Sequence, residues 1–130
     1  MENKIINGTD LGPRITLETN GNIGISGKSR MEDASLYYQE VHDWISNYIS
    51  NSNNKPLTIK IKLDYFNSSS AKQLLKMLML VEDSPIKATI VWIYPIDNDV
   101  LLERGQELEI MLDLPFEYHG YSGDINYEMP

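Results

Sequence analysis

Residues 57–80 read LTIKIKLDYFNSSSAKQLLKMLML, and they decide the fold because they contain a strand, a polar turn and a helix in immediate succession. From Leu57 to Tyr65 apolar side chains alternate strictly with polar ones, which predicts a strand with one apolar and one polar face. After Phe66 the apolar spacing changes to three and four residues, which predicts a helix over about 68–82. The residues that carry this spacing are Ala71, Leu74, Leu75 and Leu78.

The polar turn consists of Asn67, Ser68, Ser69 and Ser70, so an amide and three hydroxyls lie at the start of the predicted helix. Asparagine and serine are favoured there because their side-chain oxygens accept hydrogen bonds from free backbone N–H groups. The positive partial charge of a helix N-terminus also favours an anion, so a phosphate could be bound or covalently attached at this point. Lys72 lies one turn beyond Ser68 and would reach such a group. From the residues alone, the turn is either a plain helix cap or a phosphate site.

Alternating and periodic apolar residues elsewhere predict further strands and helices. Asn20-Gly21 is a strong signal for a two-residue hairpin turn, and Ser29 with Glu32 fits a capping box for the first helix. The expected elements are strands over about 13–18 and 22–26, a helix over about 31–50, the central strand and its helix, a buried strand over about 87–94, a helix over about 99–112 and an edge strand over about 114–118. This order fits a two-layer α/β sandwich, with a mixed sheet of about four to five strands and the helices packed mainly on one face.

The chain of 130 residues is long enough for one domain with its own core. We place this single domain at residues 13–118. Residues 1–12 are polar and are expected either to be flexible or to form a short edge strand around Ile5. Residues 119–130 are polar and acidic and contain two glycines, which indicates a disordered tail.

The composition excludes several classes of site. The chain has no cysteine, so disulfides, zinc–thiolate sites and cysteine nucleophiles are ruled out. No apolar run reaches the roughly 18 residues of a membrane span, and the first residues do not resemble a signal peptide. We therefore expect no membrane insertion.

The net charge of −8 is distributed unevenly. Residues 1–96 contain ten acidic and ten basic side chains, whereas residues 97–130 contain nine acidic side chains and only Arg104. A surface this acidic repels nucleic acids and anionic membranes. It suits either a basic protein partner or simple solubility, and we expect no nucleic-acid binding.

No combination of side chains indicates catalysis. There is no nucleophile paired with a base and no cluster of metal ligands, so we expect a protein that is not an enzyme and that has no metal or cofactor site. His42 falls outside the apolar stripe of its helix, which predicts a surface residue and not a catalytic base. The acidic turn at residues 97–99 lacks the spacing of a calcium loop. A helix cap at Asn98 or Asp99 is the better interpretation.

Two surfaces are candidates for contacts with a partner. The helix after the serines is apolar on all sides near its end, which indicates either cover on several sides or an adaptable patch formed by Met77, Met79 and Leu80. We favour the patch because the same helix carries the serines. Lys60 and Lys62 lie on the polar face of the central strand, which faces either solvent or a partner.

Five motifs occur in an order that is shared with one known protein family. They are YFNSSSAKQLL at 65–75, ISGKSRMED at 25–33, WIYPIDND at 92–99, ERGQE at 103–107 and LPF at 114–116. They resemble the YFNTSSAK, SGxSxPED, WxYxxDD and ExGE motifs and the closing apolar strand of the SiaC-type regulatory phosphoproteins. The resemblance spans about residues 13–118 and implies a fold like that of STAS domains (the anti-anti-sigma type), which carry a phosphorylatable hydroxyl at a helix N-terminus.

The chain departs from the family motifs at four positions. Ser68 stands at the family's usual phosphothreonine and retains a hydroxyl. Met31 replaces a proline near the start of the first helix. Asn98 and Gln106 stand at usually acidic positions, which affects any partner or cation contact of that loop.

The resemblance implies a non-enzymatic phospho-switch in the bacterial cytoplasm. In such a switch a serine/threonine protein kinase modifies the hydroxyl and a PP2C-like phosphatase removes the phosphate. The unmodified form binds and stimulates a diguanylate cyclase, which links the switch to cyclic di-GMP and biofilm formation. Carried over to this chain, Ser68 is the expected phosphoacceptor, with Ser69 as the second choice. Asn67, Ser69 and Ser70 shape the turn, and Lys72 steadies the phosphate.

An alternative function follows from the same helix start. A sensor or binding module could hold a small anion or a nucleotide there non-covalently, although no glycine-rich loop precedes the helix as it does in a P-loop. An exposed anion pocket would favour the sensor. A solvent-facing Ser68 beside an apolar patch would favour the switch.

Overall fold

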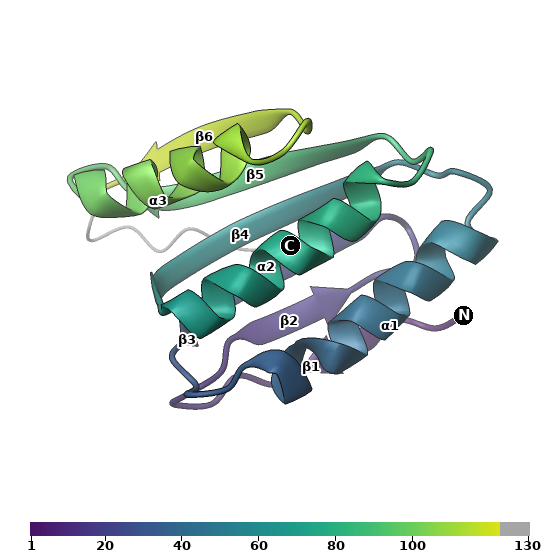
Figure 1. The fold of residues 1–130 in the computed structure, drawn as a ribbon, viewed down its shortest axis with the longest axis horizontal. Helices are drawn as coiled ribbons and strands as arrows, with labels where there is room; N and C mark the ends of the chain where they lie inside the picture. Colours follow the sequence, from purple (N-terminus) through teal and green to yellow (C-terminus); the bar gives the residue numbers. More distant parts are fainter. Residues whose placement is uncertain (123–130) are drawn as a thin grey trace.

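The computed structural model describes residues 1–122, and the expected strand–turn–helix unit lies in the middle of the fold (Figure 1). β4 runs from Leu57 to Phe66 and α2 from Ser68 to Glu82, so only Asn67 separates them. The alternating apolar residues of β4 are buried from Leu57 to Leu63, and the polar ones between them are half-buried. The alternation ends there, because Tyr65 is exposed and Phe66 is buried. The alternation and the helical spacing therefore predict this unit correctly.

β4 belongs to a six-stranded mixed sheet whose strands follow the order of the chain. The pairs from β1 to β3 are antiparallel, and the pairs from β3 to β6 are parallel. The other strands are β1 (Lys4–Ile6), β2 (Arg14–Leu17), β3 (Asn22–Ser29), β5 (Ala88–Pro95) and β6 (Phe116–Tyr121).

Three helices within residues 1–122 cover one face of this sheet (Figure 1). α1 (Ser35–Asn51), α2 and α3 (Asp99–Ile110) lie side by side in that order. Their apolar faces and that of the sheet enclose a single core, so the fold is the two-layer α/β sandwich expected from the element order. None of these three helices is both long enough and apolar enough to span a membrane.

The sheet has more strands than the four to five expected. β1 is an edge strand around Ile5, which is the second of the two possibilities for residues 1–12, and it pairs with β2. β6 passes the expected domain boundary at 118 because its pairing with β5 continues to Tyr121. Residues 123–130 of the expected tail lie outside the described part of the chain.

The first helix begins later than expected because the preceding strand is longer. β3 shifts its register near its end and continues to Ser29, which is fully buried. Ser29 therefore cannot cap a helix, and the predicted capping box with Glu32 is wrong. α1 begins at Ser35, whose backbone N–H and Oγ donate to Oδ1 of Asp33 at 3.0 and 2.7 Å.

α3 packs closely on β5 because a glycine faces the sheet. Nε1 of Trp92 donates a hydrogen bond of 2.9 Å to the carbonyl of Leu101. A Cβ on Gly105 would lie 2.7 Å from the indole of Trp92, so no larger residue permits this approach. Asn98 caps the helix, with its Oδ1 accepting from the N–H of Leu101 at 3.0 Å, in the role predicted for it.

The sheet face opposite the helices is not uniformly polar. It carries Lys60 and Lys62, which are half-buried, and also Val91 and Ile93 of β5, which are buried. Nζ of Lys62 lies 5.1 Å from the ring centroid of Tyr121. Lysine stems and aromatic rings therefore cover part of this face.

Candidate functional site

The three serines at the start of α2 have different environments. Ser68 is the first residue of the helix, and its side chain is exposed. Ser69 is half-buried, and its Oγ accepts a hydrogen bond of 2.8 Å from the N–H of Ala34. Ser70 is fully buried. The hydroxyl of Ser68 is therefore the one of the three that an enzyme could reach without opening the fold.

Ser70 belongs to a buried chain of hydroxyls beneath the helix start. Its Oγ donates to the carbonyl of Ser29 at 2.9 Å and accepts from Oγ of Ser29 at 2.6 Å. The hydroxyl of Tyr38 lies 2.9 Å from Oγ of Ser29. The hydrogen of Ser29 Oγ is donated to Ser70, so the hydroxyl of Tyr38 donates to Ser29. Burial raises the pKa of Tyr38 to about 12. The chain of hydroxyls thus ties α2 to β3 and α1.

Asn67 fixes the geometry of the turn through its side chain. Oδ1 of Asn67 accepts from the N–H of Ser70 at 3.0 Å, and Nδ2 donates to the carbonyl of Met31 at 2.8 Å. The N–H groups of Ser68 and Ser69 lie too early in the helix to find a carbonyl within it. They are therefore available as donors for an anion at this end of the helix.

Basic side chains flank the helix start on two sides. Lys72 is exposed one turn further along α2. Hydrogen bonds from Ser35 lower the pKa of Asp33, and the charge of Lys72 adds a smaller effect. On the other side lies a shallow hollow of about 340 Å³, lined by Lys28, Arg30, Tyr65 and Asn67. The surroundings of the helix start thus combine the basic side chains of Lys72, Lys28 and Arg30 with the carboxylate of Asp33.

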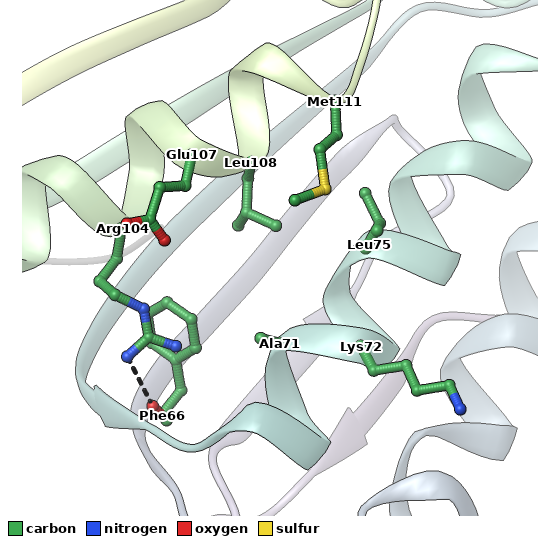
Figure 2. Close-up of a pocket in the computed structure, with 8 residues that line it drawn as sticks. All are labelled: Phe66, Ala71, Lys72, Leu75, Arg104, Glu107, Leu108 and Met111. Atoms are coloured by element: carbon green, nitrogen blue, oxygen red, sulfur yellow. Dashed lines mark hydrogen bonds between the residues drawn. The ribbon is translucent and has the colours of Figure 1, made fainter.

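A groove of about 230 Å³ lies between α2 and α3, next to the helix start (Figure 2). At one end the guanidinium of Arg104 lies 4.0 Å from the ring centroid of Phe66, and its Nη1 donates to the carbonyl of Phe66 at 3.2 Å. The amino group of Lys72 points away from α3, so the stem of Lys72 forms the wall (Figure 2). The lining residues are Phe66, Ala71, Lys72, Leu75, Arg104, Glu107, Leu108 and Met111.

The patch predicted from Met77, Met79 and Leu80 does not form one surface. Met77 is fully buried in the core, so its assignment to a partner surface is wrong. Successive helical residues point about 100° apart, which places Met77 toward the sheet and Met79 toward solvent. Leu80 is half-buried, and Met79 is exposed.

The four groove residues of α3 and its C-cap are absent from the sequence-based set of site residues; they are Arg104, Glu107, Leu108 and Met111. Arg104 lies within the ERGQE motif, and it is spaced from Leu108 and Met111 by four and seven residues. This spacing places the three on one face of a helix. This helical spacing in the sequence could therefore have predicted the wall of the groove that α3 forms.

His42 was predicted to lie on the surface, and this prediction is wrong because α1 is covered by α2 as well as by the sheet. The imidazole is buried, and Nε2 donates a hydrogen bond of 3.2 Å to the carbonyl of Gln73. Within residues 1–122, neither Nδ1 of His42 nor Oε1 of Gln73 has a hydrogen-bond partner. Burial lowers the pKa of His42 from its ordinary value of 6.5, and the hydrogen bond to Gln73 opposes this only in part.

This burial predicts a loss of stability in mild acid. Because the pKa of His42 is lower in the folded chain than the 6.5 of the unfolded chain, the unfolded state binds more protons below pH 6.5. The free energy of unfolding should therefore fall as the pH decreases from about 7.5 to 5.5. Urea unfolding at both values should show that His42→Gln removes part of this difference. The control variant His119→Gln, at an exposed position, should leave this difference unchanged. An equal effect of both variants would contradict the prediction.

Comparison with known proteins identifies relatives over nearly the whole described chain. The model of the SiaC family of regulatory phosphoproteins matches residues 6–121. A protein of Pseudomonas aeruginosa (strain UCBPP-PA14), described as uncharacterized, is 26% identical over 101 residues, which are 74% of this chain and 78% of that protein.

Solved structures agree with this match. The crystal structure of apo-SiaC from Pseudomonas aeruginosa is similar with a TM-score of 0.84 and 25% identity, over 92% of this chain and 100% of that one. A structure of the diguanylate cyclase SiaD in complex with its activator SiaC, from the same organism, matches with a TM-score of 0.85 and 24% identity, over 91% of this chain and 99% of that one. The family model and the solved structures thus match nearly the same part of the chain. This chain belongs to the SiaC family of regulatory phosphoproteins.

Proposed function

We propose that this chain is a non-enzymatic switch whose unmodified form binds and stimulates a diguanylate cyclase, and that phosphorylation of Ser68 prevents this binding. The observation that carries the proposal is the exposed hydroxyl of Ser68 at the N-terminus of α2, next to a hydrogen-bonded Ser69 and a buried Ser70. The class of partner is suggested by the similar structure in which SiaC is the activator of the cyclase SiaD. A serine/threonine kinase and a PP2C-like phosphatase would add and remove the phosphate.

The geometry lets the phosphate act without disturbing the fold. A phosphoserine adds about −1.5 to −2 charges and three acceptor oxygens. At Ser68 these face the free N–H groups of the first turn, and Lys72 lies four residues further along the helix. The modified chain should therefore stay folded, and the phosphate would change the charge of an exposed surface.

The test is phosphopeptide mapping of the chain purified from its own host, together with cyclase assays on the chain with and without the phosphate. We expect one phosphate on Ser68, stimulation by the unmodified chain and at least tenfold weaker cyclase binding by the modified chain. Ser68→Ala should bind the cyclase and resist modification. Ser69→Ala is the matched control, and it should still be modified at Ser68.

A phosphate found on Ser69 would retain the switch but contradict the assignment to Ser68. Modification of Ser68 with unchanged cyclase binding and activity would contradict the switch itself. The hollow lined by Lys28 and Arg30 favours one alternative, non-covalent binding of a small anion or nucleotide. Copurification of such an anion with a chain that is never phosphorylated would support that sensor function instead.

A further inference from the structure

The sequence contains two Asn-Gly dipeptides, and the fold gives them different freedom. They are Asn7-Gly8, in the loop between β1 and β2, and Asn20-Gly21, in the turn between β2 and β3. Asparagine before glycine is especially prone to deamidation. The backbone nitrogen of the next residue attacks the side-chain amide, and glycine has no Cβ that hinders the approach. The reaction requires a backbone N–H without a hydrogen bond and an asparagine side chain that can turn toward it.

The fold restrains Asn20-Gly21 against this reaction. The N–H of Gly21 donates to the carbonyl of Glu18 at 3.0 Å, and Oδ1 of Asn20 accepts from the N–H of Asn22 at 3.0 Å. Gly21 is buried with a φ of +99°, and its carbonyl accepts from the N–H of Thr58 at 2.8 Å. The attacking nitrogen and the side-chain amide are therefore both engaged, and the backbone around them is fixed on two sides.

Asn7-Gly8 lacks these restraints. Both residues are exposed, and they follow Ile6, the last residue of β1. Within residues 1–122, the N–H of Gly8 and the side-chain amide of Asn7 make no hydrogen bond. The hydroxyl of Tyr37 lies 3.4 Å from the carbonyl oxygen of Asn7 but 2.6 Å from that of Pro13, so Pro13 is its main acceptor. The attacking nitrogen and the amide of this dipeptide are therefore free to meet.

We infer that Asn7 is a site of spontaneous deamidation and that its isoaspartyl product loosens β1. The nitrogen of Gly8, after losing its proton to hydroxide, forms a bond to Cγ of Asn7, and the side-chain amide takes a proton from water and leaves as ammonia. Water then opens the resulting cyclic imide at either carbonyl. One opening gives aspartate, and the other gives isoaspartate, whose main chain runs through the former side-chain carbonyl. Overall, water is consumed, ammonia is released, and nothing is oxidised or reduced.

Isoaspartate changes both the length and the charge of the chain next to β1. The main chain gains one carbon–carbon bond of about 1.5 Å, and a carboxylate replaces the carbonyl of Asn7 that faces Tyr37. This carboxylate adds a negative charge to a chain of net charge −8. The extra length shifts β1 relative to the following turn, which is held by hydrogen bonds of 2.9 Å between Thr9 and Gly12.

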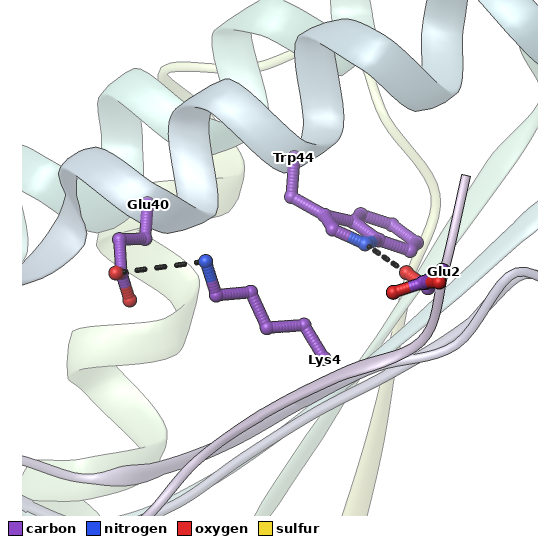
Figure 3. Close-up of polar contacts among 4 residues, drawn as sticks. All are labelled: Glu2, Lys4, Glu40 and Trp44. Carbon is purple, nitrogen blue, oxygen red and sulfur yellow. Dashed lines mark hydrogen bonds and ion pairs between the residues drawn. The ribbon is translucent and has the colours of Figure 1, made fainter.

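β1 is poorly placed to resist such a shift, because few contacts hold it (Figure 3). It has three residues and pairs with β2 alone. Nε1 of Trp44 donates to the carbonyl of Glu2 at 3.0 Å, and Nζ of Lys4 lies 3.5 Å from Oε1 of Glu40. Both side chains of this ion pair are exposed, so it contributes little to stability. A short edge strand with so few contacts opens at a low free energy, and the indole of Trp44 then loses its acceptor.

The test follows both dipeptides in the full-length chain during incubation at mildly alkaline pH. Intact mass reports the conversion, and peptide mapping with a protein-isoaspartate methyltransferase locates it. We expect conversion at Asn7 at least about tenfold faster than at Asn20, because the second reaction must first break the hydrogen bond of Gly21. In concentrated urea, where the fold is lost, the two dipeptides should react at nearly equal rates.

Two variants separate the reaction from its product. Asn7→Gln keeps an exposed amide but would have to close a larger, less favourable ring, so it should abolish the fast conversion. Asn7→Asp adds the charge without the additional main-chain bond. Hydrogen exchange should show loss of protection in residues 4–6 of the isoaspartyl chain and little loss in Asn7→Asp. The NMR signal of the indole N–H of Trp44 should shift in the isoaspartyl chain, whereas that of buried Trp92 should stay in place.

Three results would overturn this assignment. Conversion of the folded chain at Asn20 as fast as at Asn7 would show that the fold does not select between the dipeptides. Unchanged protection of residues 4–6 in the isoaspartyl chain would show that β1 absorbs the extra length. Equal loss of protection in Asn7→Asp would assign the effect to the charge and not to the main chain. None of these measurements involves Ser68 or a cyclase, so their results are independent of the proposed function.

Discussion

Replacement of Ser70 by aspartate is expected to remove a large part of the free energy of unfolding, whereas the same replacement at Ser68 should leave it unchanged or slightly higher. Ser70 is fully buried, and its Oγ exchanges hydrogen bonds with Ser29. An uncompensated buried charge destabilises by roughly 3–5 kcal/mol, which is comparable to the about 5–15 kcal/mol stability of a whole domain. At Ser68 the carboxylate would be exposed at the helix N-terminus, where it stabilises by about 0.3–1 kcal/mol.

Urea unfolding followed by circular dichroism measures both changes. Ser70→Ala is the control for the loss of the hydroxyl alone, and it should destabilise by about 1–2 kcal/mol because a buried hydrogen bond is lost without a new charge. Ser69→Asp should fall between the other two aspartate variants, since Ser69 is half-buried and its Oγ accepts from Ala34. If the Ser70→Asp variant were as stable as the wild type, the hydrogen bonds among Ser70, Ser29 and Tyr38 would have to open readily. This result would also remove the argument that selects Ser68 as phosphoacceptor.

Gly21→Ala is expected to be the most destabilising of the conservative glycine substitutions. Gly21 has a φ of +99°, a conformation that side chains rarely adopt, and a Cβ there would lie 2.2 Å from the carbonyl oxygen of Pro56. The strain alone corresponds to about 1–3 kcal/mol, and displacement of the backbone neighbour adds about 1–3 kcal/mol. The N–H of Thr58 also donates to the carbonyl of Gly21 at 2.8 Å, so the displacement reaches β4.

Gly27→Ala separates these two contributions. Gly27 has a similar φ of +109°, but the nearest atom to its Cβ would be 3.8 Å away. It should therefore show the conformational strain without the clash, and the difference in urea midpoint between the two variants should give the contribution of the contact with Pro56. Equal destabilisation by both substitutions would contradict this partition.

The alternation in β4 and the spacing in α2 were sufficient to predict the central unit, because each follows from a local period of two or 3.6 residues. The start of α1 could not be predicted in this way. Ser29 and Glu32 form a plausible capping box locally, but the sheet extends through Ser29 and buries it. Tertiary pairing overrides the local signal at this position.

The errors at His42 and Met77 have a shared cause. In each case the pattern along one helix does not show what covers the residue: His42 is buried against Gln73 of α2, and Met77 is buried in the core between α2 and the sheet. The selection among the three serines depends on the same kind of information. Their sequence positions are almost equivalent, and only the contacts with Ala34 and Ser29 distinguish them. The groove likewise joins residues of α2 and α3 that are about thirty positions apart.

The arrangement of the sheet in chain order has a consequence for the growing polypeptide. Each strand pairs with the one made just before it, so no strand must wait for a later one. Because N-terminal segments fold first during synthesis, the surroundings of Ser70 are complete once α2 has left the ribosome. The second wall of the groove appears about thirty residues later, with α3. A nascent chain therefore exposes Ser68 before the second wall of the groove between α2 and α3 exists.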